Sequence, residues 1–382
     1  MIHLVIRQPA PYQVYLCREL DKGFAGLFVA WFGQGSSNEL PFIKFGDFQF
    51  ESHYLDQEGY FSLARHLWSD KAAVIILGGW SSSMTFPTLL IASVLRRPIF
   101  IWLDHPHPRK RGMLFAILRR TYLYILDKLV AGFLACGTPT VNHLLAIGLR
   151  NQNIVCFPYW VSIPSRKENF KTSYFGASAQ LLRLLAVGRH VKVKQFDTAI
   201  ETLARVNENN GSRVAELVLV GDGPERNTLE SLSSTLGCSE SVKFTGWLSN
   251  EQVYDEIQKC DAVMITSSFE PYGVILLEAM AAGKIVLASE GVIGAQDRND
   301  RSGAILLHPV GNSEYLAMQI QDLARNRDRL AIGSSSARRI AEEWPPERAV
   351  SILNQLFLNT KRGRMLTAIL ASKLDSMMPG QR

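Results

Sequence analysis

Short apolar runs alternate with helical stretches along most of this 382-residue chain. A buried strand followed by a helix, repeated several times, is typical of a parallel sheet with helices on both faces. The alternation therefore predicts an α/β fold with doubly wound sheets. In the first half we expect strands at 2–6, 27–31, 74–77, 99–103, 132–135 and 154–157, and helices at 59–68, 84–95, 112–128 and 138–147.

A second alternating series follows a stretch, 162–180, that loses all periodicity and reads as a linker. The expected strands are 181–187, 216–220, 242–245, 262–266, 285–288 and 304–307. The expected helices are 197–209, 225–236, 250–259, 273–282, 315–326, 336–343 and 347–359, and a basic, poorly patterned tail follows Thr360.

The length exceeds that of one typical core, so the two series predict two domains. We expect an N-terminal domain at 1–165, a linker at 166–180 and a C-terminal domain at 181–345. A C-terminal helix and tail at 346–382 complete the chain, and packing back on the N-terminal domain is one arrangement open to them.

Composition limits the compartment and the class of protein. Hydrophobic residues make up 47% and charged residues 20% of the chain, as in folded proteins. The five scattered cysteines lack paired spacing, which favours a reducing compartment over a disulfide framework or a structural zinc site. A charge at Arg7 argues against a signal peptide, and no uncharged apolar run is long enough to span a bilayer. We therefore expect a cytoplasmic protein, soluble or peripheral at the inner face of the membrane.

The stretch 265–283 joins a strand end, a tight turn and a helix start, with a carboxylate on each side of the turn. A helix that begins at Gly273 points its first backbone N–H groups at whatever lies beyond the strand, which suits an anion such as phosphate. Glu278 lies four residues after Val274, on the same helix face, whereas Glu270 stands on the loop in front. The alternative is an ordinary strand-to-helix turn whose glutamates are solvated or cap the helix.

Other expected strands of the second series also end in glycine-containing loops. In open sheets of this type, ligands bind beyond the carboxyl ends of the strands. Together, the segments 188–194, 220–224, 242–246 and 270–278, in this order and spacing, resemble the C-terminal domain of glycosyltransferase family 4. The resemblance is specific over 181–303 and architectural elsewhere.

Members of that family have the GT-B fold, in which two Rossmann-like doubly wound domains face a cleft, and they transfer a sugar from a nucleotide diphosphate with retention of configuration. The resemblance implies that Arg189 and Lys194 neutralise the donor diphosphate. Two fixed cations can stabilise the leaving diphosphate in place of a divalent metal, so no metal and no cofactor are expected. An exposed basic loop is the alternative interpretation of this pair.

The same resemblance implies that Glu270 contacts hydroxyls of the donor sugar, with the amides of Gly273 and Val274 near sugar and phosphate. Glu278 would accept hydrogen bonds from the ribose hydroxyls. Gly221 and Gly246 would wall the nucleotide, although a plain strand-to-helix connection explains these two glycines nearly as well.

The N-terminal domain is expected to hold the acceptor, and here the chain departs from the family. Many relatives carry a glycine-rich loop after the first strand, but this chain has Arg-Gln-Pro-Ala-Pro-Tyr at 7–12. The turn of Gly78 and Gly79 is the nearest substitute, although two glycines in a turn need no functional explanation.

Polar residues also follow the expected strand 99–103. Family members often place a histidine at this strand end, close to the reacting sugar, and Asp104, His105 or His107 could take that place. We select His105 as the catalytic candidate and Asp104 as an acceptor-side residue. Ordinary surface groups are the alternative.

The segment 106–128 is both basic and very apolar. Such a helix can lie on an anionic membrane surface, and a core helix with a solvated basic edge is the alternative. No recognition motif supports a nucleic-acid partner. The basic residues are Arg109, Lys110, Arg111, Arg119, Arg120 and Lys128.

These features predict a retaining hexosyltransferase that uses a nucleotide-diphosphate sugar and a glycan or lipid-linked acceptor, in cell-surface polysaccharide or glycolipid synthesis. The resemblance implies a mechanism in which the leaving phosphate assists attack on the same face, without a protein nucleophile. Two alternatives stay open. One is a nucleotide-sugar epimerase of the same fold, and the other is a catalytically silent subunit that binds a nucleotide sugar.

Overall fold

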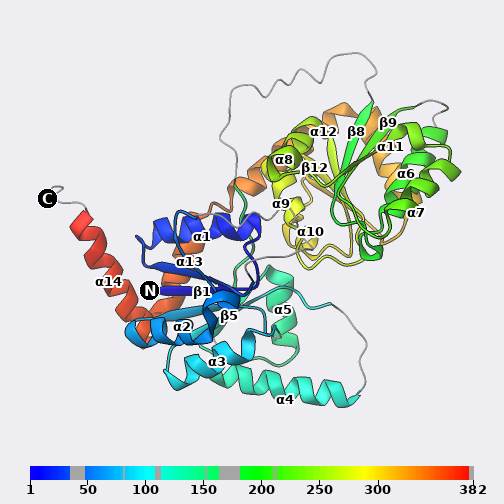
Figure 1. The fold of residues 1–382 in the computed structure, drawn as a ribbon. Coiled ribbons are helices and arrows are strands. Elements are labelled where there is room, and N and C mark those ends of the chain that lie inside the picture. Colours follow the sequence, from blue (N-terminus) through cyan, green and yellow to red (C-terminus); the bar gives the residue numbers. More distant parts are fainter. Residues whose placement is uncertain are drawn as a thin grey trace. The chain divides into compact units, whose positions relative to one another are not determined.

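A computed structural model describes residues 1–34, 48–80, 82–107, 113–150, 153–162, 181–209, 211 and 213–377 (Figure 1). The chain divides into two compact units, Met1–Trp160 with Pro345–Arg382, and Val161–Trp344. The predicted linker at 166–180 lies outside the described residues.

The first unit contains a parallel sheet of seven strands in the order β3-β2-β1-β4-β5-β6-β7. Most of these strands are apolar on both faces, because helices cover both sides of the sheet. The strands are β1 (Ile2–Ile6), β2 (Phe28–Phe32), β3 (Glu51–Tyr54), β4 (Val74–Gly78), β5 (Ile99–Leu103), β6 (Gly132–Ala135) and β7 (Ile154–Cys156).

Two groups of helices enclose this sheet. Residues of α2 (Leu55–Ser69), α3 (Thr85–Val94), α4 (Met113–Leu129) and α5 (Thr138–Ala146) share one core cluster with it. On the other face, Phe357 of α13 (Glu347–Leu358) packs against Phe24, which follows α1 (Pro11–Gly23), and against Phe100 of β5, at ring-centroid distances of 6.1 and 5.7 Å. Chain segments more than 300 residues apart in the sequence therefore build one core.

The second unit contains six parallel strands in the order β10-β9-β8-β11-β12-β13, with a separate apolar core on each face. The strands are β8 (Leu182–Val187), β9 (Ala215–Val220), β10 (Val242–Gly246), β11 (Ala262–Ile265), β12 (Ile285–Ser289) and β13 (Ile305–His308). The helices are α6 (Phe196–Asn209), α7 (Arg226–Thr235), α8 (Asn250–Lys259), α9 (Val274–Ala281), α10 (Ile293–Arg298), α11 (Ser313–Arg325) and α12 (Arg327–Glu342), with 3₁₀ turns η2 (Lys192–Lys194) and η3 (Ser239–Ser241).

The predicted pair of doubly wound parallel sheets is confirmed, and every predicted strand is present within one residue of its expected bounds. The prediction for α12 was wrong, because this helix begins nine residues before position 336. Gly333 lies inside it, and a Cβ there would come within 2.5 Å of Ile285 Cδ1. Gly333 therefore weakens the helical pattern in the sequence, and its missing side chain lets α12 pack closely on the sheet.

The prediction of an unpatterned tail after Thr360 was also wrong, because α14 (Lys361–Met377) begins there. The Thr360 hydroxyl accepts a hydrogen bond from the Gly363 amide at 2.9 Å and so caps the helix. Leu366 and Leu370, four residues apart, are buried on one helix face. The surrounding basic residues hide this short apolar stripe in the sequence.

Two helices and one strand, α1, α10 and β3, follow from no pattern identified in the sequence. Helix α1 starts with Pro11 at its first position, where proline's missing N–H costs nothing. Strand β3 reads Glu-Ser-His-Tyr and forms the edge of its sheet, so it carries no apolar run. No helix in the described part of the chain is long and apolar enough to cross a bilayer.

We expect Leu366→Ala to lower the free energy of unfolding by about 2–5 kcal/mol, because the fully buried leucine leaves a cavity under α14. Ile369→Ala is the matched control, since this side chain on the same helix is 45% exposed. Urea unfolding followed by circular dichroism measures both. Equal small effects would show that α14 is not packed.

Candidate functional site

The predicted donor residues follow strands that meet at the switch point of the second sheet. Its strand order reverses between β8 and β11, and the crevice beyond such a reversal is where doubly wound sheets bind ligands. Arg189 comes two residues after β8, and Glu270 comes five residues after β11. The topology therefore brings the two segments to the same edge.

Glycines allow the loops at this edge to touch through their backbones. Gly221 has φ +120°, and a Cβ on it would lie 2.0 Å from the carbonyl oxygen of Gly188. The Gly188 amide donates to the Val220 carbonyl, and the Gly221 amide donates to the Gly246 carbonyl, each at 2.9 Å. Gly221 and Gly246 are thus brought together, and no larger residue fits at position 221.

Lys194 and Glu270 form an ion pair across this edge, and both side chains are partly buried. The backbone around them is fixed in place. The Thr266 hydroxyl donates to the Lys194 carbonyl at 2.9 Å, and the Ser268 amide donates to the Val193 carbonyl at 2.8 Å. A cation and a carboxylate from distant segments are therefore held in one place.

The turn between the two glutamates has the predicted form. Gly273 has φ +88° and stands immediately before Val274, the first residue of α9. Its ideal Cβ position lies 3.3 Å from Glu270 Cγ, so the glycine and the carboxylate are neighbours. The first amides of a helix have no carbonyl partner within it and attract anions, and in α9 the third amide, that of Leu276, donates to the Gly273 carbonyl at 3.0 Å.

Glu278 lies one turn into α9 and keeps only part of its surface exposed. Burial raises the pKa of its carboxyl to about 7, and no hydrogen bond from the described part of the chain offsets this burial. A carboxyl in this state can accept hydrogen bonds from a ligand that brings its own hydroxyl donors.

Arg189 is exposed on the loop after β8, and the residue that follows it anchors that loop. His190 is fully buried and packs edge-on against Phe196 and Phe244, with centroid distances of 5.3 and 6.3 Å. Burial lowers the pKa of His190, so the ring packs as a neutral imidazole. Its amide donates to the Asp222 carbonyl at 2.9 Å, which ties the loop of Arg189 to the loop after β9.

A network not predicted from the sequence supports the turn that carries Glu270. The buried Tyr272 hydroxyl donates to the Asp297 carboxylate at 3.3 Å and accepts from Arg298 Nε at 3.0 Å. The Arg298 guanidinium lies 4.0 Å from the ring centroid of Trp344. Tyr272 stands inside the recognised motif, but its partners lie 25 or more residues away, so no local spacing reveals them.

The acceptor-side candidates lie at the carboxyl edge of the first sheet. Gly79, with φ +84°, donates its amide to the Trp102 carbonyl at 2.7 Å, and Gly78 packs against Ile6. Asp104 accepts a hydrogen bond from the Tyr159 hydroxyl at 2.6 Å.

The histidines that follow β5 differ in environment. His105 is half-buried, and burial lowers its pKa, whereas His107 is exposed. Tyr12, at the start of α1, packs edge-on against Tyr159 at 4.6 Å. The segment at 7–12 thus contributes an aromatic ring and a helix start to this edge, and Tyr12 and Tyr159 join the residues not selected from the sequence.

Comparison with known protein families matches one segment of the chain. Residues 176–341 match the family described as "Glycosyl transferases group 1". This segment of the chain therefore belongs to that glycosyltransferase family.

Among curated relatives, the chain is similar to the lipopolysaccharide core biosynthesis glycosyltransferase LpsD of Rhizobium meliloti (strain 1021). The two are 35% identical over 159 residues, which is 41% of this chain and 44% of LpsD. The match thus spans less than half of that relative's length.

Solved structures show the fold over nearly the whole chain. Anabaena HepE in complex with UDP matches with a TM-score of 0.70 at 19% identity, covering 97% of this chain and 99% of that one. WaaG, a glycosyltransferase involved in lipopolysaccharide biosynthesis, matches with a TM-score of 0.63 at 16% identity, covering 92% and 99%. At these identities the likeness concerns the fold alone, and the predicted GT-B fold is confirmed.

The raised pKa of Glu278 gives a testable pH dependence. Because the folded chain holds this proton more tightly than the unfolded chain, stability falls as pH rises from about 4.5 to about 7. Relative to Glu278→Gln, the wild type should lose on the order of 1–3 kcal/mol between about pH 5 and about pH 8. Urea unfolding at both pH values measures this loss.

Glu314→Gln, which changes an exposed glutamate of α11, is the control and should follow the wild type. A wild-type profile parallel to that of Glu278→Gln would contradict the assigned environment of Glu278.

Proposed function

We propose that this chain is a retaining hexosyltransferase that moves a sugar from a nucleotide diphosphate to a glycan or lipid-linked acceptor in cell-surface polysaccharide or glycolipid synthesis. The observation that carries the proposal is the ion pair of Lys194 and Glu270 at the switch point of the matched segment. LpsD is named for lipopolysaccharide core biosynthesis, and HepE has been solved in complex with UDP-glucose. We take UDP-glucose as the first donor to test.

In this proposal Arg189 and Lys194 stabilise the diphosphate as the bond to the sugar breaks. Negative charge grows on the leaving oxygen, and fixed cations that meet it there lower the barrier without reorganising. Lys194 already stands against Glu270, so its ammonium is preorganised before the donor binds. The two cations together would allow transfer without a divalent metal.

The two glutamates of the motif would hold the two ends of the donor. Glu270 accepts hydrogen bonds from hydroxyls of the hexose, beside the first amides of α9. Glu278 accepts them from the ribose, whose hydroxyls would favour the charged carboxylate and lower its pKa. The acceptor would use the edge of the first sheet at Gly78, Gly79, Asp104 and His105.

We expect Arg189→Ala and Lys194→Ala each to lower kcat about 10²- to 10³-fold, as is typical when a group that stabilises transition-state charge is removed. Lys192→Ala is the matched control, since Lys192 is an exposed cation of the same short segment and should keep near wild-type activity. Transfer from UDP-glucose to a lipopolysaccharide-core or lipid-linked acceptor panel, with EDTA present, provides the measurement. Full turnover in either variant would contradict the assignment.

Incubation with donor alone separates the alternatives. A new nucleotide sugar without acceptor would indicate an epimerase. Donor binding by calorimetry, without transfer across the panel, would indicate a silent binding subunit.

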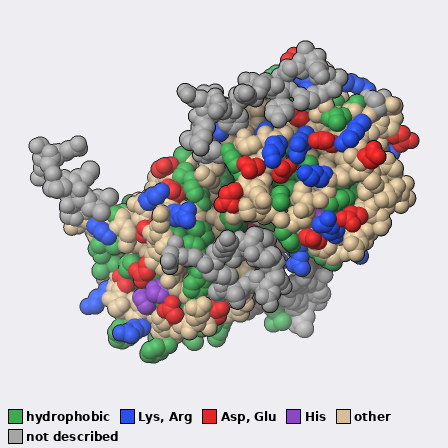
Figure 2. Space-filling view, turned by 45° about the horizontal axis from the view of Figure 1, so that its top comes forward, with side chains coloured by type: hydrophobic (Ala, Val, Ile, Leu, Met, Phe, Trp, Pro, Cys, Tyr) green, Lys and Arg blue, Asp and Glu red, His purple; other side chains and the backbone are tan. Residues whose placement is uncertain are grey.

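We also propose that the first unit docks on the inner, anionic face of a membrane. Acidic and basic side chains are intermingled on the face drawn in Figure 2. The net charge of +6 is modest, so the proposal rests on a local surface that is both basic and apolar. Helices α3 and α4 supply it, since α4 joins Arg119, Arg120 and Lys128 to a row of exposed apolar side chains. The exposed apolar residues are Phe86, Leu90, Val94, Ile117, Leu118, Tyr122, Tyr124, Ile125 and Leu129. Arg109, Lys110 and Arg111 lie outside the described residues.

Replacing Leu118 and Ile125 together by Gln should abolish flotation with liposomes that contain anionic lipid, because both exposed side chains lie on α4. Ile332→Gln is the control, since this exposed isoleucine belongs to α12 of the second unit. Equal flotation on neutral and anionic liposomes, or unchanged flotation of the double variant, would contradict the proposed membrane contact. In that case α4 is an ordinary helix with a solvated basic edge.

A further inference from the structure

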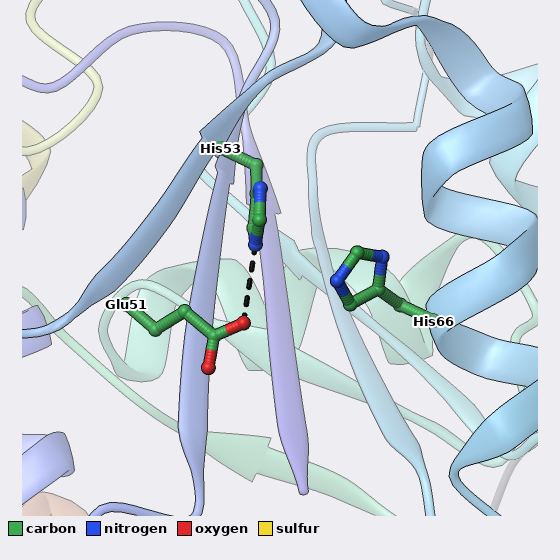
Figure 3. Close-up of side chains that lie close together, drawn as sticks. All are labelled: Glu51, His53 and His66. Atoms are coloured by element: carbon green, nitrogen blue, oxygen red, sulfur yellow. Dashed lines mark hydrogen bonds and ion pairs between the residues drawn. The ribbon is translucent and has the colours of Figure 1, made fainter.

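Three potential metal ligands converge at the edge of the first sheet, on a different unit from the donor residues (Figure 3). Glu51 and His53 come from β3, and His66 comes from α2. One ligand atom from each residue lies within 4.8 Å of the other two. These residues take no part in the proposed transfer reaction.

Local structure explains why these side chains meet. Glu51 and His53 are two residues apart on a strand, so they project from the same face. His53 is the register partner of Trp31 on β2 and stacks on its indole with ring centroids 4.4 Å apart. The ring of His66 stands edge-on to the same indole at 5.0 Å. Trp31 is fully buried, so it forms a fixed wall behind both imidazoles.

Hydrogen bonds orient both imidazoles in the same way. His53 Nδ1 lies 2.9 Å from the Glu58 carboxylate, and His66 Nδ1 lies 2.9 Å from the Ser62 carbonyl oxygen. Both partners are acceptors, so each Nδ1 carries a hydrogen and donates it. A neutral ring then has its lone pair on Nε2. Histidines that ligate metals are held in this way, by a carboxylate or a carbonyl on the second nitrogen.

The contact between His53 and Glu51 brings two acceptor atoms together. His53 Nε2 lies 3.1 Å from Glu51 Oε1, and in the neutral ring both atoms are acceptors. A cation bound between the two atoms resolves this conflict, and so does a proton on either of them. A bound cation would also be coordinated by the Nε2 lone pair of His66. A proton on His53 would leave that lone pair without a role.

We propose that Glu51, His53 and His66 bind a divalent transition-metal ion, with Zn²⁺ as the first choice. Two imidazole nitrogens and one carboxylate oxygen are a donor set that suits Zn²⁺, and solvent completes the tetrahedron. The ion joins the edge strand β3 to α2. Because the ligands are not arranged in the unfolded chain, binding stabilises the first unit.

The test uses the full chain without an affinity tag, stripped of metal with EDTA and then titrated with Zn²⁺ by calorimetry. We expect one ion per chain and a rise in Tm that depends on Zn²⁺ concentration. Substituting Co²⁺ should give the visible absorption of a four-coordinate site. His66→Gln and Glu51→Gln should remove both signals, and Glu58→Gln should weaken binding about 10- to 100-fold, as expected for a residue that orients a ligand.

His107→Gln is the matched control, since this exposed histidine lies after β5, away from the cluster, and should bind Zn²⁺ like the wild type. Glu51 is 48% exposed, so Glu51→Gln keeps the test open if His66→Gln fails to fold. No Zn²⁺ binding by the wild type would overturn the proposal. Binding that is unchanged in Glu51→Gln and His66→Gln would overturn it too.

Discussion

The backbone contact between Gly221 and Gly188 is the constraint on which the candidate donor site depends. A carbonyl oxygen occupies the space that a side chain at position 221 would need, so the loops after β8 and β9 lie directly against each other. The amides of Gly188 and Gly221 donate to the carbonyls of Val220 and Gly246. The buried His190 ring packs against Phe196, and its amide donates to the Asp222 carbonyl of the adjoining loop. Arg189 is therefore presented from a loop with little freedom, which is the condition under which a fixed charge helps a reaction.

Burial at the carboxyl edge of the second sheet lowers the stability of the folded chain. Burial of Glu278 disfavours its charged form, whereas the positive φ of the neighbouring turn is one that Gly273 adopts without strain. The Tyr272–Arg298 network and the stacking of Arg298 on Trp344 support the turn from behind. Unfavourable burial at a site, offset by tight packing around it, is what one expects where a ligand supplies the missing partners.

The parts of this molecule that could be predicted from sequence are those whose signal is local. Strands buried on both faces appear as apolar runs, and the motif that joins Glu270 to Glu278 is continuous, so both were found. Strand β3 was missed because an edge strand needs no apolar run, and α14 because its buried stripe consists mainly of Leu366 and Leu370. Tyr272 with Arg298, and His53 with His66, are partners only in three dimensions.

The placement of Phe357 has a consequence for how the chain folds during synthesis. This ring fills the core between Phe24 and Phe100, yet it follows the whole of Val161–Trp344 in the sequence. A ribosome therefore completes the second unit before it releases the residues that finish the first. Until then one face of the first sheet lacks the part of its cover that α13 provides, so the nascent chain exposes an apolar surface of the kind that chaperones bind.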